Sequence, residues 1–254
     1  MDYQSLKVRF EDKICYIQIY RPDDNNTIND QLIFEFQNVL EECKKESSII
    51  VLEGLPEVFC FGADFKSIQN AVSQGNSTQQ NPSPMYEIWQ ELATGPFFTI
   101  AHVRGKANAG GIGFVAACDI VLADKTAVFS LSELLFGVFP ACVLPFLIKK
   151  IGFQKAHYMT LMTQPISVEK AYSWGLVDAY EEHSENLLRK HLLRLRLLSK
   201  TAISRYKKYM NRLNKSLEQS KETAIEANLE VFTDLENIEG IVKYVETGKF
   251  PWEK

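Results

Sequence analysis

Cysteine and histidine are scarce in this sequence, and neither is spaced to build a metal site or a disulfide framework. The 254 residues include 5 cysteines and 4 histidines, with no C-x-x-C pair and no H-x-x-x-H pair among them. Scattered cysteines in odd number are typical of reduced cytoplasmic thiols rather than of a secreted disulfide scaffold or a zinc cluster. We therefore expect a cytoplasmic protein with no metal and no cofactor.

Long apolar runs are also lacking. The longest, over residues 138–148, is interrupted by proline and falls short of the roughly 20 residues that a membrane span requires. The first residues, MDYQSLKVRFED, contain neither an apolar core nor a cleavage site. We therefore expect neither a signal peptide nor a membrane partner.

Positive charge is scarce outside one segment. The chain carries 28 basic and 32 acidic residues, for a net charge of −4, yet residues 187–215 contain ten basic residues and no acidic one. The remainder of the chain holds 18 basic and 32 acidic residues, a balance of −14. This excludes an overall basic coat for nucleic acid and leaves one basic segment on an acidic body.

Short β-branched runs alternate with amphipathic stretches in the first half of the chain. Apolar spacing predicts a helix from Ile28 to about Glu42, with Asn26 or Thr27 as its cap. Strands are predicted over 7–10 and 14–20 as a hairpin, and then over 48–54, 97–103 and 119–123. Strands that alternate with helices predict an α/β fold with a largely parallel sheet, and the polar residues 73–84 predict a loop.

The last part of the chain lacks strand patterns. From Leu188 to Leu217, apolar residues recur three or four positions apart, which predicts a long helix, broken near Ser199, whose one apolar face packs against the protein. We expect its Lys and Arg side chains to lie in solvent. The predicted division is a strand-and-helix core over residues 1–185 and a helical region over 186–254.

Glycine is concentrated in one stretch. Five of the 13 glycines fall within 95–113, around the strand predicted at 97–103. The G-x-G-x-x-A pattern at 111–116 matches a dinucleotide-binding fingerprint, but the preceding strand ends too early, and the next begins too soon for a crossover helix. The glycines instead indicate close packing of the backbone, or a place where the backbone approaches a ligand.

A second turn, FCFGADF (59–65), follows the strand predicted at 48–54. There Gly62 and Ala63 are expected to open a helix and to leave the Ala63 N–H free. Free N–H groups from two such turns that converge on one oxygen form an oxyanion hole, which stabilises an enolate. A plain strand-to-helix turn is the alternative.

One carboxylate lies in a strongly apolar stretch, AVFSLSELLFGVFP. Glu133 follows Ser130 at the spacing of a capping box, a role that requires no chemistry. Alternatively, burial would raise the pKa of the Glu133 carboxyl toward neutrality, which suits proton transfer at a carbon acid. The sequence leaves both interpretations open.

In this order and spacing, FCFGAD, RGKANAGGIGFVAACDIVLAD and FSLSELLFGVFP resemble the enoyl-CoA hydratase/isomerase (crotonase) superfamily over about residues 6–250. The resemblance implies a crotonase-like spiral of ββα units with a C-terminal helical trimerisation region, and hence a homotrimer or hexamer. It also implies a catalytic set of Glu133 with the oxyanion-hole donors Ala63 and Gly110, and a substrate-binding set of Phe59, Cys60, Phe61, Gly62 and Gly111.

Two features depart from the pattern of the superfamily. Gly113 stands where hydratases with two catalytic glutamates carry the first of them, so simple hydration of an enoyl-CoA is not implied. PACVLPF (140–146) replaces a glycine-rich stretch, which implies a reshaped pocket near Cys142.

Further segments, among them KAHYMTLMTQPIS and YVETGKFPWE, resemble one subgroup more closely: the dehydratases of HMG-synthase-type β-branching cassettes in bacterial polyketide pathways. This likeness implies a lyase that dehydrates a 3-hydroxy-3-methylglutaryl group to a 3-methylglutaconyl group. It also implies that an acyl carrier protein or CoA carries the thioester. Through the oxyanion hole, Glu133 would remove the α-proton and the β-hydroxyl would then leave.

Other functions remain open. A decarboxylase, an isomerase or a hydratase of acyl-CoA thioesters shares the oxyanion hole, and the basic segment alone motivates an RNA-binding protein on a hydratase scaffold. We do not expect nucleic acid as the partner. The alternative to a packed helix with solvated charges is a docking face near the pocket mouth, for a carrier protein or for the phosphates of a pantetheine or nucleotide carrier. Charge reversal at Arg205, Lys207 and Lys208 would then weaken turnover on a carrier protein more than turnover of a short pantetheine thioester.

Overall fold

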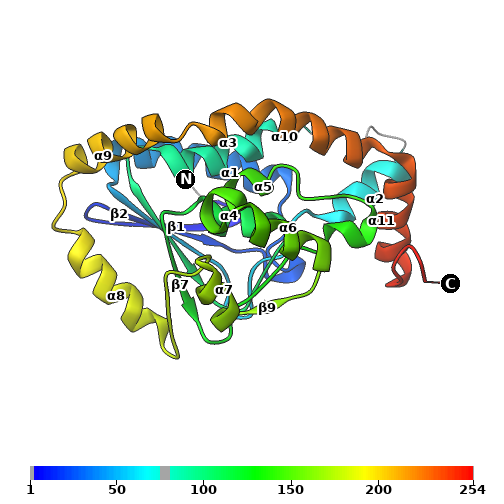
Figure 1. Cartoon of the computed structure of the whole chain (residues 1–254), viewed down its shortest axis with the longest axis horizontal. Helices are drawn as coiled ribbons and strands as arrows, with labels where there is room; N and C mark the ends of the chain where they lie inside the picture. The colour runs from blue at the N-terminus through cyan, green and yellow to red at the C-terminus, as the bar shows by residue number, and fades with distance from the viewer. Residues whose placement is uncertain (1–2, 75–80, 254) are drawn as a thin grey trace.

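The larger of two sheets follows the predicted strands. The computed structural model describes residues 3–74 and 81–253. The sheet runs in the order β1-β2-β3-β5-β7-β10, with β1 (Leu6–Glu11), β2 (Ile14–Ile19), β3 (Ile49–Glu53), β5 (Phe98–Val103), β7 (Ile120–Asp124) and β10 (Ala179–Glu181). β1 and β2 pair antiparallel as the predicted hairpin, and every later pair is parallel. The predicted α/β class is confirmed (Figure 1).

A second, smaller sheet runs in the order β4-β6-β8-β9. Its strands are β4 (Val58–Cys60), β6 (Lys106–Asn108), β8 (Val128–Ser130) and β9 (Ile166–Ser167), and the first three are parallel. These three strands each follow a strand of the larger sheet and precede a helix: α2 (Phe65–Ser73), α4 (Gly110–Ala117) and the short 3-10 helix η2 (Glu133–Phe136). The repeat β3-β4-α2, β5-β6-α4, β7-β8-η2 is the expected crotonase-like spiral of ββα units.

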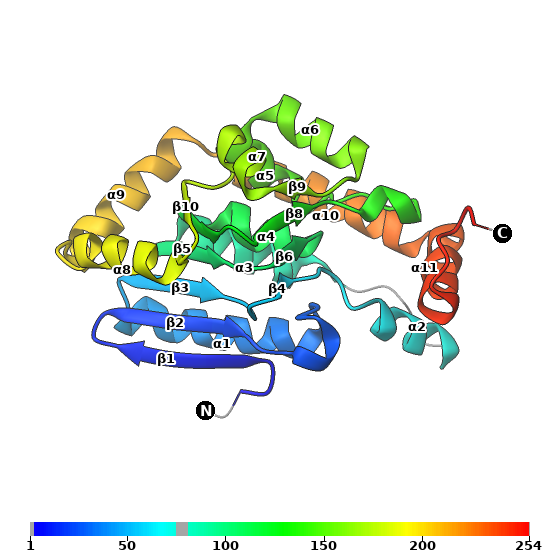
Figure 2. The same ribbon diagram turned by 90° about the horizontal axis from the view of Figure 1, so that it is seen from below.

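The helix α4 lies at the centre of the molecule in both views (Figures 1 and 2). Its sequence GGIGFVAA contains no charged residue, and seven of its eight residues are buried, because it has no polar face to turn toward solvent. The surrounding helices are α1 (Asp30–Glu46), α3 (Ser83–Thr94), α5 (Leu144–Ile151), α6 (Phe153–Met162) and α7 (Val168–Trp174). All five cysteines are free and lie in the interior.

The start of α1 differs from the prediction. Asn29 is the cap, and its side chain accepts a hydrogen bond from the Leu32 N–H, so the prediction of Asn26 or Thr27 was wrong. Asn26 is buried in a left-handed conformation (φ 53°), and its amide donates to the carbonyl oxygens of Ile19, Val58 and Phe59. An Asn can cap a helix or join strands from a turn, and only tertiary contacts decide which.

The loop predicted at 73–84 is bounded by α2, which ends at Ser73, and α3, which begins at Ser83. Residues 75–80 of that loop lie outside the described residues. Within the described ranges, every helix is too short or too polar to cross a bilayer, and the same ranges contain no cluster of three His, Cys, Asp or Glu side chains that could hold a metal ion.

The C-terminal region is helical, as predicted, and broken at Ser199. The helices are α8 (Ser184–Leu195), α9 (Lys200–Leu213), α10 (Ser216–Thr233) and α11 (Leu235–Thr247), and Ser199 caps α9. The predicted apolar face packs only in part. Of its residues, Leu188, Leu192 and Leu217 are buried, whereas Leu198, Tyr206, Tyr209 and Leu213 are between 38% and 63% exposed. Helix α9 packs instead through Ile203 and Lys207. Much of the apolar face of α9 is therefore uncovered in the single chain.

The basic segment is not uniformly solvated, which corrects the prediction. Lys207 is buried, and its ammonium donates to both carboxylate oxygens of Asp119 at 2.5 and 2.7 Å. Asp119 also accepts hydrogen bonds from the backbone N–H and hydroxyl of Thr99 in β5. Lys207 thus joins α9 to the large sheet and is not available to a docking partner.

The basic segment lies at one end of the molecule. α8 and α9 form this end, and α2 and α11, which lie side by side, form the opposite end in both views (Figures 1 and 2). The helix that follows the first predicted oxyanion-hole turn, α2, therefore lies far from the basic segment.

Replacing Lys207 by methionine should lower the free energy of unfolding by about 3 kcal/mol, because it leaves the Asp119 carboxylate without its cation. This is the low end for a buried pair, since Asp119 keeps some contact with solvent. Urea denaturation measures the loss. Lys208→Met, at an exposed position on the same helix, should change stability by no more than about 0.5 kcal/mol; equal losses would contradict the structural role of Lys207.

Candidate active site

The predicted site residues follow three neighbouring parallel strands at the same end. Ala63 follows β4, Gly110 follows β6 and Glu133 follows β8, and these strands are adjacent in the small sheet. Parallel strands place their carboxyl ends at one edge. The segments that are 70 residues apart in sequence therefore meet at this edge.

The first two turns are in direct contact at Gly62. A Cβ on Gly62 would lie 2.6 Å from the Ala109 Cβ and 3.1 Å from the Gly110 nitrogen. The backbone at Gly62 is also left-handed, with φ +92°, a region that favours glycine. Gly62 therefore permits the close approach that puts the Ala63 and Gly110 amides beside each other.

The N–H of Ala63 faces away from its neighbouring chain. In the parallel bridge between Ile28 and Ala63, the Ile28 N–H donates to the Gly62 carbonyl at 2.7 Å and the Asp64 N–H donates to the Ile28 carbonyl at 3.1 Å. This pattern uses the groups on both sides of Ala63 and leaves its own N–H on the opposite side. Helix α2 begins only at Phe65 with Asp64 as its cap, so the expectation that Gly62 and Ala63 open the helix was wrong, although the Ala63 N–H has no backbone partner among the described residues.

The second donor is Gly110, the first residue of α4. The N–H groups in the first turn of a helix have no partner within the helix, and the Gly110 N–H makes no other backbone hydrogen bond within the described ranges. The adjoining Gly111 packs directly on the Cys60 carbonyl, so α4 lies against β4 without space for a side chain. Glycines 110 and 111 thus present a helix N-terminus next to the Ala63 turn, an arrangement that suits an oxyanion hole.

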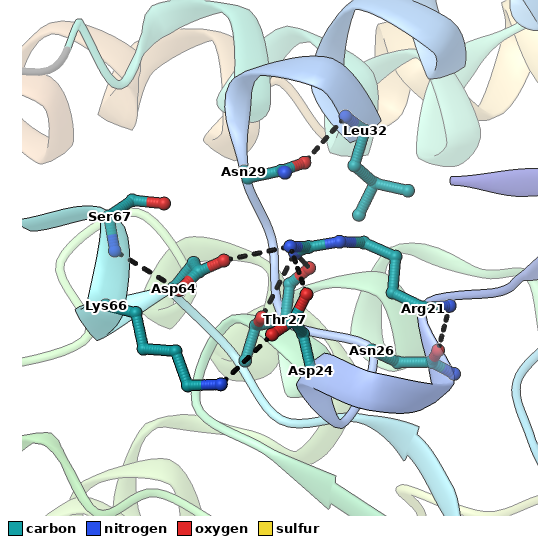
Figure 3. A network of polar contacts seen from close by, with 9 residues as sticks. All are labelled: Arg21, Asp24, Asn26, Thr27, Asn29, Leu32, Asp64, Lys66 and Ser67. Atoms are coloured by element: carbon teal, nitrogen blue, oxygen red, sulfur yellow. Dashed lines mark hydrogen bonds and ion pairs between the residues drawn. The ribbon is translucent and has the colours of Figure 1, made fainter. Parts of the chain in front are cut away.

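A partly buried ionic network holds the Ala63 turn in place (Figure 3). The Arg21 guanidinium pairs with Asp64 and with Asp24, each at 3.0 Å, and donates to the carbonyl and hydroxyl of Thr27. Asp64 in turn accepts a hydrogen bond from the Ser67 N–H in α2. Arg21 therefore holds Thr27 and Asp64, which adjoin the two residues of the Ile28–Ala63 bridge.

Replacing Arg21 by methionine should lower turnover by about one order of magnitude, because misplacing a reacting group by 1 Å costs up to about 100-fold. Steady-state kinetics measure the loss in kcat. The matched control is Lys66→Met, which removes an exposed ion pair to the same Asp24 (3.2 Å) and should leave kcat unchanged. An equal loss of kcat in both variants would show that turnover depends on the ion pairs of Asp24 and not on the position of the Ala63 turn.

Glu133 is a buried carboxylate without a full set of partners. It begins η2, is 8% exposed, and its Oε2 has no hydrogen-bond partner among the described residues. Burial raises the pKa of the Glu133 carboxyl to about 7, and the backbone amides of Glu133 and Ser132 offset this only in part. A carboxyl with a pKa near neutrality can both accept and return a proton.

The capping-box interpretation of Glu133 was wrong. Ser130 belongs to β8, and its hydroxyl donates to Asn108 Oδ1 at 2.7 Å, while Asn108 Nδ2 donates to the Ser132 hydroxyl at 3.0 Å. Both serines therefore hold Asn108 of β6 and neither caps η2. Asn108 joins the strand before Gly110 to the turn before Glu133, a positioning role that the sequence did not indicate.

The C-terminal helices α10 and α11 pack against the elements that follow Ala63 and Glu133. Helix α11 lies beside α2 (Figures 1 and 2), and one buried cluster combines these two helices with the η2 segment. Its core consists of Ile68, Phe136, Val138, Val231 and Ile241. Residues beyond 186 thus contribute to the support of Glu133.

Of the predicted substrate-binding residues that have a side chain, only Phe61 exposes it. Phe59 and Cys60 are fully buried in the main core, which leaves their backbone alone to line a path, whereas Phe61 is 41% exposed. Two further polar side chains, Tyr86 and His102, are core residues. The Tyr86 hydroxyl donates to the Leu217 carbonyl at 2.6 Å, and the His102 ring contacts Glu53 and Ser184.

Trp89 of α3 occupies the space at Gly113, and the sequence did not indicate it. A Cβ on Gly113 would lie 2.5 Å from the Cε2 and Cζ2 atoms of the Trp89 indole. No side chain fits at position 113 while Trp89 holds this place. No local pattern pairs positions 89 and 113, so only the fold could have revealed the contact.

The activity should depend on the ionisation of Glu133. As a base the carboxyl must be deprotonated, so kcat/KM should rise with pH to a plateau, with a midpoint near pH 7. A pH–rate profile measures it. A midpoint at the ordinary glutamate value of about 4.3 would contradict the buried base.

Known proteins resemble this chain, one of them over nearly its whole length. The enoyl-CoA hydratase/isomerase family model matches residues 9–254. The bacillaene synthase dehydratase PksH of Bacillus subtilis (strain 168) is 58% identical over 252 residues, 99% of this chain and 97% of that protein. The mevalonyl-coenzyme A hydratase sidH of Aspergillus fumigatus is 29% identical over 177 residues, 68% of this chain and 65% of that protein.

Solved structures agree. The crystal structure of a Bacillus subtilis protein assigned as a polyketide biosynthesis enoyl-CoA hydratase (pksH) matches with a TM-score of 0.97 and 57% identity, covering 98% of this chain and 100% of that chain. An enoyl-CoA hydratase/isomerase fold from Acinetobacter baumannii matches with a TM-score of 0.86 at 21% identity, covering 96% of this chain and 100% of that chain.

Proposed function

Because the chain belongs to the enoyl-CoA hydratase/isomerase family, we propose that it is a lyase of polyketide biosynthesis that dehydrates a 3-hydroxy-3-methylglutaryl thioester to a 3-methylglutaconyl thioester. The observation that carries this proposal is a buried Glu133 carboxylate at the same sheet edge as the Ala63 and Gly110 N–H groups. Within the described residues, Glu133 Oε2 has no hydrogen-bond partner and neither N–H has a backbone partner. The 58% identity to a bacillaene synthase dehydratase supports the choice of dehydration and of the pathway.

In the proposed mechanism, the Ala63 and Gly110 N–H groups bind the thioester oxygen and stabilise the negative charge that develops there. The ionised Glu133 removes the proton at C2, and the electron pair forms an enolate. The C3–O bond then breaks as the C2–C3 double bond forms. Glu133 returns its proton to the departing oxygen, so one molecule of water leaves and the carboxylate is restored.

Gly113 explains why one carboxylate would carry out both proton transfers. Position 113 has no side chain, and the Trp89 indole fills the adjacent space, so no second acid–base group comes from α4. A tertiary C3 hydroxyl leaves the enolate more readily than a secondary one, because the double bond that forms at C3 carries one more alkyl substituent and is more stable. The reaction therefore demands less acid catalysis than the hydration of a straight-chain enoyl thioester.

The proposed carrier is an acyl carrier protein, with CoA as the alternative. The relative from Bacillus subtilis is named for a synthase, and such synthases hold their intermediates on carrier proteins. The fungal relative is named for mevalonyl-coenzyme A, whose acyl group also bears a 3-hydroxy-3-methyl carbon. That name supports a substrate branched at C3 on either carrier.

The proposed assembly is a homotrimer or hexamer. The apolar side chains of α9 that remain exposed, among them Tyr206, Tyr209 and Leu213, form a face that a single chain does not cover. Burial of such side chains between subunits would be favourable.

The function is tested by incubating the protein with 3-hydroxy-3-methylglutaryl acyl carrier protein and measuring the acyl mass. Loss of water alone is the expected result. Additional loss of carbon dioxide would indicate a decarboxylase, the alternative on the same fold. An unchanged mass on both the carrier protein and CoA would contradict the proposal.

A further inference from the structure

Two buried polar atoms without hydrogen-bond partners belong to the elements around the candidate site. Within the described residues, the buried side-chain atoms that lack a partner are Ser47 Oγ, Trp89 Nε1 and Glu133 Oε2. Buried polar groups are nearly always hydrogen-bonded, so each exception requires an explanation. The proposed proton transfer explains Glu133. The Trp89 N–H, which can only donate, is used by no step of the mechanism.

The indole of Trp89 lies along the first turn of α4. Its Cε2 and Cζ2 atoms would be 2.5 Å from a Cβ on Gly113, and its Cζ2 would be 3.8 Å from a Cβ on Gly110. Gly110 and Gly113 are three residues apart and share one face of the helix. Nε1 is bonded to Cε2, so the unpartnered N–H lies next to the turn that supplies an oxyanion-hole donor.

The ring cannot turn this N–H toward solvent. Trp89 is 3% exposed. Phe114 of α4 and Phe146 of α5 contact the indole edge to face, each with ring centroids 5.9 Å away. Phe146 comes from the 140–146 stretch that departs from the superfamily. The Trp89 N–H is therefore held in place, and a hydrogen-bond acceptor for it must be supplied by a bound ligand.

We infer that the Trp89 N–H donates a hydrogen bond to the C3 oxygen of the substrate, the hydroxyl that leaves as water. This inference rests on the proposed function. There, the thioester oxygen is bound by Ala63 and Gly110 and the C2 proton goes to Glu133, so the C3 oxygen has no protein group to hold it until Glu133 returns that proton. An indole N–H does not release its proton near neutral pH. Trp89 thus orients the hydroxyl and selects thioesters that carry it, and Glu133 supplies the proton.

The first test uses the indole N–H signals in ¹H–¹⁵N spectra. The chain has three tryptophans, and Trp89→Phe assigns the signal of interest. In the Glu133→Gln protein, which should turn over substrate far more slowly than the wild type, 3-hydroxy-3-methylglutaryl-pantetheine should shift the Trp89 indole signal downfield. The 3-methylglutaryl thioester, which lacks only the hydroxyl, should not, and the 3-hydroxy-3-methylbutanoyl thioester, which lacks the distal carboxylate, should shift it as the full substrate does.

The outcomes separate the inference from the proposed function. Equal shifts with and without the 3-hydroxyl, or a shift that requires the distal carboxylate, would overturn the role of Trp89 while leaving the dehydratase intact. If none of the three thioesters moves the backbone signals of Ala63 and Gly110, substrate does not bind there, and the proposed function fails together with the inference.

A second test removes the donor and keeps the shape of the ring. Benzothienylalanine at position 89 replaces the N–H by sulfur and should lower kcat/KM for the 3-hydroxy substrate by about tenfold, the effect of one neutral hydrogen bond. Its affinity for the 3-methylglutaryl thioester should stay unchanged, because that ligand has no C3 oxygen. The control is Trp252→Phe, at a residue that is 60% exposed. Unchanged kcat/KM in the benzothienylalanine variant would overturn the inference.

Discussion

Replacing Glu133 by glutamine should lower kcat by about 10² to 10⁴-fold, the contribution of a positioned general base. Glutamine keeps the shape of the side chain and cannot accept the C2 proton. The fold should survive, because Glu133 Oε2 has no hydrogen-bond partner to lose. Single-turnover kinetics on a pantetheine thioester measure the loss independently of product release.

The same variant should alter the dependence of stability on pH. Because burial raises the pKa of Glu133 to about 7, the folded protein binds a proton that the unfolded chain, with a pKa of about 4.3, releases. Stability from this proton is present at low pH and is lost as the pH rises to about 7. Glu133→Gln should abolish that loss, so its stability relative to the wild type should increase across this range.

The matched control is Glu35→Gln, the same substitution at another buried carboxylate. Glu35 accepts hydrogen bonds from the backbone N–H groups of Gln4 and Ser5 and from the Gln31 amide, at 2.7 to 2.9 Å. This variant should lose about 1–3 kcal/mol of stability and keep its turnover. The assignment of Glu133 would be refuted by near-wild-type turnover in Glu133→Gln, or by equal losses of turnover in both variants.

Gly62→Ala should lower kcat by about 10² to 10³-fold, the effect of losing one oxyanion-hole donor. The new Cβ would lie 2.6 Å from the Ala109 Cβ and 3.1 Å from the Gly110 nitrogen, so the two turns must separate. Separation moves the Ala63 and Gly110 N–H groups off a common oxygen. Binding of the substrate's distant parts should suffer less, so the loss should appear in kcat more than in KM.

Backbone strain is separated from this clash by a second glycine. Gly175 has a similar conformation (φ +82°), but a Cβ there meets nothing within 4 Å. Gly175→Ala should therefore cost about 1–2 kcal/mol of stability from the left-handed backbone and leave kcat unchanged. If Gly175→Ala loses as much activity as Gly62→Ala, the effect comes from general destabilisation rather than from the oxyanion hole.

Five strands of the larger sheet and the site motifs could be predicted because each is written in consecutive residues, whereas the strands of two or three residues (β4, β6, β8, β9 and β10) were not predicted. The β-branched runs that became β3, β5 and β7 show their burial locally. The glycines at positions 62 and 111 could be recognised in the sequence because the backbone at both places leaves no room for a side chain, which only glycine allows. The direction of the Glu133 pKa shift followed from its apolar neighbours alone.

The rest depended on partners distant in the sequence. Asn26 looked like a helix cap, but it holds β2 and β4 together. The sequence predicted a solvated Lys207, because its partner Asp119 lies 88 residues away in the chain. The spacing of Ser130 and Glu133 fits a capping box, but the Ser130 hydroxyl donates its hydrogen bond to Asn108 instead. Polar side chains accept several roles, and the tertiary structure decides among them.

The burial of all five thiols makes the protein its own reporter of local opening. Burial raises the pKa of Cys60, Cys118 and Cys142 to about 12, so a maleimide or disulfide reagent reacts with them only in molecules that have opened. The carbonyl of Cys60 lies directly under Gly111. The alkylation rate of Cys60 therefore measures how often β4 and α4 separate. A bound thioester should lower this rate.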